Sequence, residues 1–121
     1  MIYKERVSVT TTGTAGAATG NANSKAIRGR ILAVAINFHA SAPATTDTTI
    51  ACSQPFSYNI LVVTSSVTDL YAQPRATLVD SANAAITDSY DHFVVDGTIN
   101  VALAQCDALT NAAVVDIWYE K

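Results

Sequence analysis

Large apolar residues alternate with small or polar residues along several stretches of the chain. In residues 30–39 the large side chains fall on every second position: Leu32, Val34, Ile36 and Phe38. The same two-residue period recurs in 99–103 and in 115–119. Successive side chains point to opposite faces of a strand, whereas a helix would scatter these positions around its circumference. The pattern therefore predicts strands with one buried face.

Other stretches predict further strands. Residues 58–64 form a continuous apolar run, which is typical of a strand covered on both faces. Shorter candidates are Tyr3–Thr11, Thr48–Ser53, Arg75–Val79 and His92–Val95. Turn residues separate the candidates, and no stretch has a helical stripe. Together they predict an all-β fold, either an antiparallel β-sandwich or a jelly-roll-like barrel.

The Asp-Gly pair at 96–97 lies between β-branched neighbours, which is a strong hairpin signal. A two-residue turn there would pair Val94 with Ile99, His92 with Val101 and Tyr90 with Leu103. In that register Tyr90 and Val94 would line the core. A second hairpin through 107–112 would join 101–106 to 114–120, so the last three strands would form an antiparallel meander.

The first quarter of the chain has a different composition. Residues 11–24 are rich in Thr, Gly, Ala and Asn and contain no large apolar side chain. Such a segment cannot contribute a core by itself. We expect an N-terminal strand followed by an extended arm or loop over residues 1–26, and a β-sandwich body over residues 27–121.

Charge is sparse and unevenly distributed. Only 14% of the 121 residues are charged, against about 25% in an average soluble domain. Residues 1–30 carry five cations and one glutamate, a net charge of +4, whereas residues 31–121 have a net charge of -7. This composition excludes a disordered acidic tail, a polybasic nucleic-acid binder and a disulfide scaffold. It favours self-association or docking on another surface, since complementary potentials steer such contacts.

Nothing in the sequence supports catalysis or a cofactor. The two histidines, His39 and His92, have no partners at metal-ligand spacing, so a hydrogen-bonded structural role is the better interpretation of His92. Aspartates in 88–96 lack the spacing of a calcium loop. Cys52 and Cys106 are expected to be buried thiols, with one disulfide as the alternative. The longest apolar run is six residues, too short to span a membrane.

Three residues are candidates for a contact surface. Tyr71 and Arg75 occur close together, and Trp118 falls on the outer face if Ile117 and its alternate neighbours face the core. Tyr, Trp and Arg are the residue types enriched at the energetic centre of protein interfaces. The alternative for Arg75 is the start of an edge strand.

From residue 27 onward the order of landmarks resembles the decoration (cement) proteins that coat capsids of tailed bacteriophages. The stretches that carry the resemblance are GRILAVAINFH (29–39), PATTDTTI (43–50), YAQPR (71–75), VDGTINVALAQCD (95–107) and VVDIWYE (114–120). The resemblance implies a homotrimer on the capsid exterior of the virion, made in the host cytoplasm, that binds the major capsid protein. It also implies that an N-terminal arm makes contacts, and the basic positions suited to this are Lys4, Arg6, Lys25, Arg28 and Arg30.

Two other functions stay open at this point. One is a β-module of a phage tail or baseplate, which would be present in few copies per particle. The other is a β-sandwich that binds carbohydrate or a host surface, for which exposed aromatic residues in a groove are expected. Tyr71 and Trp118 are the candidates for such a groove.

Overall fold

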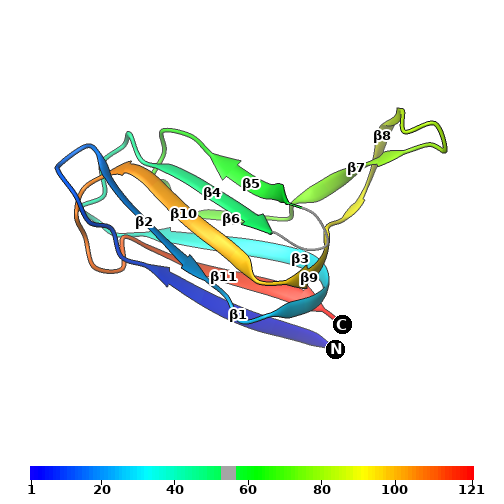
Figure 1. The fold of residues 1–121 in the computed structure, drawn as a ribbon, viewed down its shortest axis with the longest axis horizontal. Coiled ribbons are helices and arrows are strands. Elements are labelled where there is room, and N and C mark those ends of the chain that lie inside the picture. Colours follow the sequence, from blue (N-terminus) through cyan, green and yellow to red (C-terminus); the bar gives the residue numbers. More distant parts are fainter. Residues whose placement is uncertain (53–56) are drawn as a thin grey trace.

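The computed structural model describes residues 1–52 and 57–121 and contains no helix among them (Figure 1). The all-β prediction is confirmed. The strands are β1 (Ile2–Val9), β2 (Ala18–Asn23), β3 (Ile27–Phe38), β4 (Asp47–Cys52), β5 (Tyr58–Val63), β6 (Leu70–Ala72), β7 (Arg75–Val79), β8 (Ala85–His92), β9 (Val94–Gly97), β10 (Ile99–Cys106) and β11 (Ala113–Glu120). The strand candidate that ends at Ser53 is β4, and Ser53 itself lies outside the described residues.

Two antiparallel sheets form the body. The first sheet has the order β1-β11-β3-β6, with β9 also paired to β3, and the second has the order β2-β10-β4-β5. Their inner faces pack against each other through fully buried branched aliphatic side chains, among them Ile31, Ile36, Ile50, Val101 and Ile117. Burial of these side chains is the main source of stability, because apolar area removed from water contributes about 25 cal/mol per Å².

A bulge in β3 changes which residues face the core. Val34 and Ile36 are fully buried as predicted, but the register with β11 shifts where Trp118 lies opposite Ala33 and Tyr119 opposite Ile31. The extra residue is Leu32, which is displaced from the core, and Ile31 is buried in its place. One inserted residue reverses the alternation of a strand. The predicted face was therefore wrong at Leu32.

The N-terminal segment is part of the sandwich and does not form an arm. β1 pairs with β11 along its whole length, and β2 pairs with β10. Val7, Val9 and Ala18 are buried. The small residues of 11–24 allow backbones to approach closely, because a Cβ added at Gly20 would lie 2.3 Å from the carbonyl oxygen of Thr10. The predicted N-terminal strand is present as β1, but the expected arm was wrong, because residues 18–23 form β2 and composition does not reveal strands that pack through their backbone.

The Asp96-Gly97 pair does not form a hairpin turn. β9 pairs with residues 27–30 of β3 in the first sheet, whereas β10 lies in the second sheet. The pair therefore carries the chain across the sandwich. Val95 and Ile99 are both buried, but Tyr90 and Val94 are each 59% exposed. The predicted register, its core positions at Tyr90 and Val94, and the C-terminal meander were wrong.

The apolar run at 58–64 is an edge strand. β5 pairs on one side with β4 and ends the second sheet. Ile60 is buried, whereas Val62 is 51% exposed. Coverage on both faces was therefore a wrong prediction.

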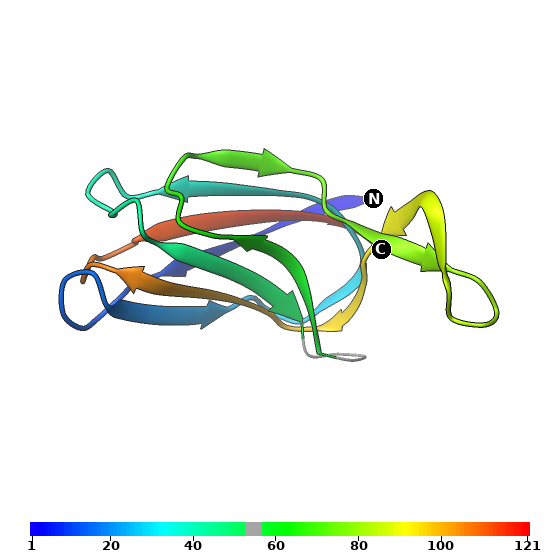
Figure 2. The same ribbon diagram turned by 90° about the horizontal axis from the view of Figure 1, so that it is seen from above.

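A hairpin projects from one end of the body. β7 and β8 pair only with each other, through the register of Arg75 with His92 and Thr77 with Tyr90. Both views show this pair extending away from the sandwich, at the end where the two termini lie (Figures 1 and 2). We call Arg75–His92 the arm. An isolated two-stranded hairpin is marginally stable in water, so we expect the arm to be the least stable part of the described structure.

Candidate functional site

The three contact candidates from the sequence lie together on the outer side of the first sheet. Tyr71 of β6 and Trp118 of β11 meet edge to face, with ring centroids 6.2 Å apart. They line one groove of about 430 Å³, which we call the aromatic groove: Ile2, Leu32, Ala33, Tyr71, Gln73, Arg75 and Trp118. Strands distant in sequence thus place an indole, a phenol and a guanidinium side by side.

The bulge in β3 helps to build the groove. It turns Leu32 from the core toward the groove, and the main-chain carbonyl of Leu32 accepts a hydrogen bond of 3.2 Å from Arg75 Nη1. The same nitrogen donates to the carbonyl of Pro74 at 2.9 Å. The guanidinium is therefore held in place beside the rings. Arg75 also begins β7, which confirms the strand start, and its role in a contact surface stays a prediction.

Basic side chains project from β1 and β3, two of the strands that contribute residues to the groove. Lys4 and Arg6 project from β1 opposite Trp118 and Asp116, and Arg28 and Arg30 project from β3. Together with the aromatic groove these four residues define what we call the basic face. Lys25 lies outside it, between β2 and β3, where its main-chain N–H donates to Glu5 at 3.3 Å. The structure therefore brings Tyr71, Arg75 and Trp118 together in the groove and places Lys4, Arg6, Arg28 and Arg30 on β1 and β3 of the same sheet.

Ion pairs hold three of the four cations. Arg6 binds Asp116 through two hydrogen bonds of 2.7 and 3.0 Å, Arg28 binds Asp96 at 2.9 Å, and Arg30 binds Glu120 at 2.5 Å. Asp116 is only 7% exposed. The hydrogen bonds from Arg6 hold the pKa of Asp116 below its ordinary value, and Arg30 lowers the pKa of Glu120 in the same way.

Because of the Arg6–Asp116 pair, we expect the folded chain to lose stability at acidic pH. Because the folded-state pKa of Asp116 is lowered, its contribution is present above its ordinary pKa of 3.8 and is lost as pH falls through the folded value. Asp116→Asn should lower the melting temperature at pH 7 and flatten its decline below about pH 4. Thermal melts from pH 2 to pH 7 measure this. Asp88→Asn on the exposed arm is the control. If the melting temperature of Asp116→Asn fell at acidic pH as steeply as that of the unaltered chain, Asp116 would not be the source of the pH dependence.

The arm carries an apolar and acidic surface. Four of its side chains are substantially exposed: Leu78 (40%), Val79 (50%), Ile86 (42%) and Tyr90 (59%). Between residues 76 and 92 there are three aspartates and neither Lys nor Arg. Leu78 and Val79 are consecutive in β7 and therefore point to opposite faces of the hairpin, so apolar side chains are exposed on both of its faces.

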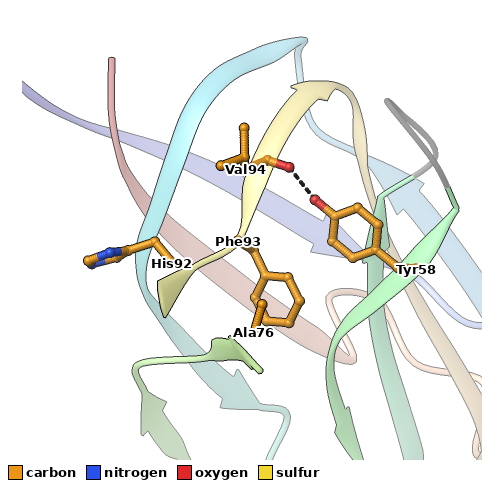
Figure 3. A pocket seen from close by; sticks show the side chains of 5 residues that line it. All are labelled: Tyr58, Ala76, His92, Phe93 and Val94. Atoms are coloured by element: carbon orange, nitrogen blue, oxygen red, sulfur yellow. Dashed lines mark hydrogen bonds between the residues drawn. The ribbon is translucent and has the colours of Figure 1, made fainter. Parts of the chain in front are cut away.

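A joint fixes the arm to the body. Phe93 follows the arm and stacks on Tyr58 of β5, with centroids 5.4 Å apart and planes at 15°. The Tyr58 hydroxyl donates a hydrogen bond to the carbonyl of Val94 (Figure 3). Burial raises the pKa of Tyr58, so this hydroxyl stays protonated. Phe93 and Val94, at the end of the arm, are thereby tied to β5 of the second sheet.

The remaining sequence candidates are separate from these surfaces. His92 is not in the core; its Nδ1 lies 3.2 Å from Asp91 at the base of the arm. Cys52 and Cys106 are buried, and no disulfide joins them. Among residues 1–52 and 57–121, no group of three or more His, Cys, Asp or Glu side chains could hold a metal ion. Within the same ranges no helix is long and apolar enough to cross a membrane.

Sequence reasoning missed the arm and four groove residues, Ile2, Leu32, Ala33 and Gln73. The arm had a signal, because two short β-rich stretches flank Asp80-Ser81-Ala82-Asn83, which is a typical turn sequence. The hairpin prediction at 96–97 assigned β8 to the wrong partner. Leu32 depends on a bulge, which has no signal in the alternating pattern.

Comparisons with known proteins identify no family. No family model and no curated protein matches the chain. Solved structures that resemble it include a point variant of the carbohydrate-binding module CBM29-2 (12% identity, covering 98% of this chain and 81% of that one, TM-score 0.33). A family 29 carbohydrate-binding module (11%, 98% and 77%, 0.31) and a second CBM29-2 variant complexed with cellulohexaose (11%, 98% and 79%, 0.30) are also similar. At these TM-scores the likenesses assign neither a family nor a ligand.

Proposed function

We propose that this protein is a non-catalytic structural subunit that decorates the outside of a bacteriophage capsid and stabilises contacts between major capsid subunits. The observation that carries the proposal is the arm, a hairpin outside the sandwich whose apolar side chains are uncovered. A coat protein needs surfaces for repeated contacts, and the energies of many such contacts add across copies. The resemblance of the sequence to decoration proteins supports the capsid as the location.

The basic face supports the same function. Trp, Tyr and Arg side chains that line a groove with aliphatic neighbours are the usual anchors of protein interfaces. Ile2 and Tyr71 are 61% and 62% exposed, so the groove is open to a partner. The surrounding cations would steer an acidic protein surface toward it.

Heating particles with and without the protein tests this function. Capsids that lack the protein should bind it in many symmetry-equivalent copies and then disrupt at a higher temperature. An unrelated β-sandwich of similar size is the control for crowding. Equal disruption temperatures would contradict the decoration role, and a few copies per particle would indicate a tail or baseplate component.

A second candidate function is carbohydrate binding, which the composition of the aromatic groove favours. Tyr71 and Trp118 lie beside two planar polar side chains, Gln73 and Arg75. Ligand sites combine apolar and aromatic walls with a few polar groups in this way. Trp118 is the only tryptophan of the chain, so its fluorescence reports on the groove directly. A saturable change on titration with soluble oligosaccharides, lost in Gln73→Ala, would establish this function in place of protein docking.

A further inference from the structure

We infer that the arm of one chain packs into the aromatic groove of a second copy of this chain. This inference rests on the proposed structural role and identifies the molecule that the arm binds. It concerns two surfaces of one molecule that both lack a cover, the apolar side chains of β7–β8 and the groove that contains Trp118 and Tyr71. Charge, polarity and the direction of the arm favour a second copy of the chain as the molecule in the groove.

The two surfaces have opposite charge. The arm beyond Arg75 contributes Asp80, Asp88 and Asp91 and no cation. On the basic face, five cations outnumber the three carboxylates of Asp96, Asp116 and Glu120. Lys4 projects from the edge strand next to Trp118. Complementary potentials favour the association of an acidic element with this face and disfavour arm-to-arm contact, where like charges would meet.

The two surfaces also have matching polarity. The arm exposes Leu78, Val79, Ile86 and the ring of Tyr90 over its two faces, and the groove presents Ile2, Leu32 and an edge-to-face aromatic pair. A two-stranded hairpin needs packing against another element to be stable. The groove supplies an apolar and aromatic surface of the kind that a hairpin lacks.

The arm cannot serve its own groove. It extends away from the sandwich in both views (Figures 1 and 2), and Arg75 at its base is bonded to β3 and begins β7. The stacked pair of Tyr58 and Phe93 anchors its other strand to the second sheet (Figure 3). With both strands held at the base, the tip is directed toward a neighbouring molecule.

Such a contact joins two different patches. Each chain has one arm and one groove, so the association is head-to-tail. It forms a closed ring when the rotation between neighbouring chains permits closure. In the closed oligomer the exposed apolar residues of both patches become covered.

Complementation between two defective variants tests the inference. The arm-defective variant is Leu78→Ser with Tyr90→Ser, and the groove-defective variant is Tyr71→Ser with Trp118→Ser. Each alone should be monomeric by sedimentation velocity, whereas an equimolar mixture should form a one-to-one heterodimer, because one intact arm and one intact groove remain. Val62→Ser, an equally exposed apolar residue of β5 on the second sheet, is the control and should assemble like the unaltered chain.

The outcomes separate this inference from the proposed function. If the groove-defective variant still self-associates, or the mixture forms no heterodimer, the arm-in-groove contact is wrong. Retained binding of the unaltered chain to capsids would then leave the decoration role intact. At monomer concentrations each variant should unfold cooperatively in urea with a midpoint only slightly below that of Val62→Ser. Asp88→Lys is a second arm variant and should weaken assembly at least about tenfold at low salt and less at high salt.

Discussion

Replacing Trp118 with alanine is expected to weaken self-association of the protein by at least about 30-fold. The indole is the largest side chain of the aromatic groove and contacts Tyr71 at a centroid distance of 6.2 Å. Truncating an aromatic anchor at the centre of an interface costs about 2–4 kcal/mol, because packing is lost and the pocket is left open. Sedimentation velocity over a dilution series measures the change.

A control separates this effect from a loss of folding. Val62→Ala removes an exposed apolar side chain from the opposite sheet and should leave self-association unchanged. Trp118 lies on the outer side of β11, whereas its neighbour Ile117 is fully buried. The urea midpoint of Trp118→Ala should therefore fall only slightly when it is compared at monomer concentrations. Self-association of unaltered strength in Trp118→Ala would exclude the groove as the interface.

Replacing Gly29 with alanine is expected to destabilise the folded chain by more than about 3 kcal/mol. Gly29 has a φ of +150°, and a Cβ there would lie 2.1 Å from the carbonyl oxygen of Glu120. That oxygen belongs to the backbone of β11, so it cannot move without disturbing the pairing of β11 with β3. Equilibrium urea unfolding measures the loss of stability.

Gly16→Ala is the matched control for this substitution. Gly16 also has a positive φ, +78°, but no atom lies within 4 Å of an added Cβ. Only backbone strain opposes alanine there, so a cost of about 1 kcal/mol is expected. Similar losses for the two variants would contradict the close approach of β3 to the end of β11.

The strand positions were largely predictable, whereas strand pairing was not. Alternation identified the core residues Val34, Ile36, Val101 and Ile117, because burial of one face is a local property of a strand. Which strands pair depends on how all the strand edges of the chain compete for hydrogen-bonding partners. Residues 27–30 of β3 extend past β6 and offer an edge to β9, so the Asp96-Gly97 pair connects two sheets.

The residues of the candidate site were also predictable from the sequence, whereas their arrangement in space was not. The residue types at Tyr71, Arg75 and Trp118 indicated a contact surface, but their proximity arises from the pairing of β6, β3 and β11. The charge asymmetry was also visible, yet the interpretation of residues 1–26 as an arm was wrong. The basic residues Lys4 and Arg6 lie on an ordinary strand of the sheet, and the projecting element is formed by residues 75–92.

A reconstruction of a particle that carries this protein would show both where the protein binds and what its arm contacts. We expect a β-sandwich at symmetry-equivalent positions on the outside of the capsid, with the β7–β8 arm of each copy packed against Trp118 and Tyr71 of its neighbour. A protein found only in the tail, or isolated copies whose aromatic grooves hold carbohydrate, would contradict it.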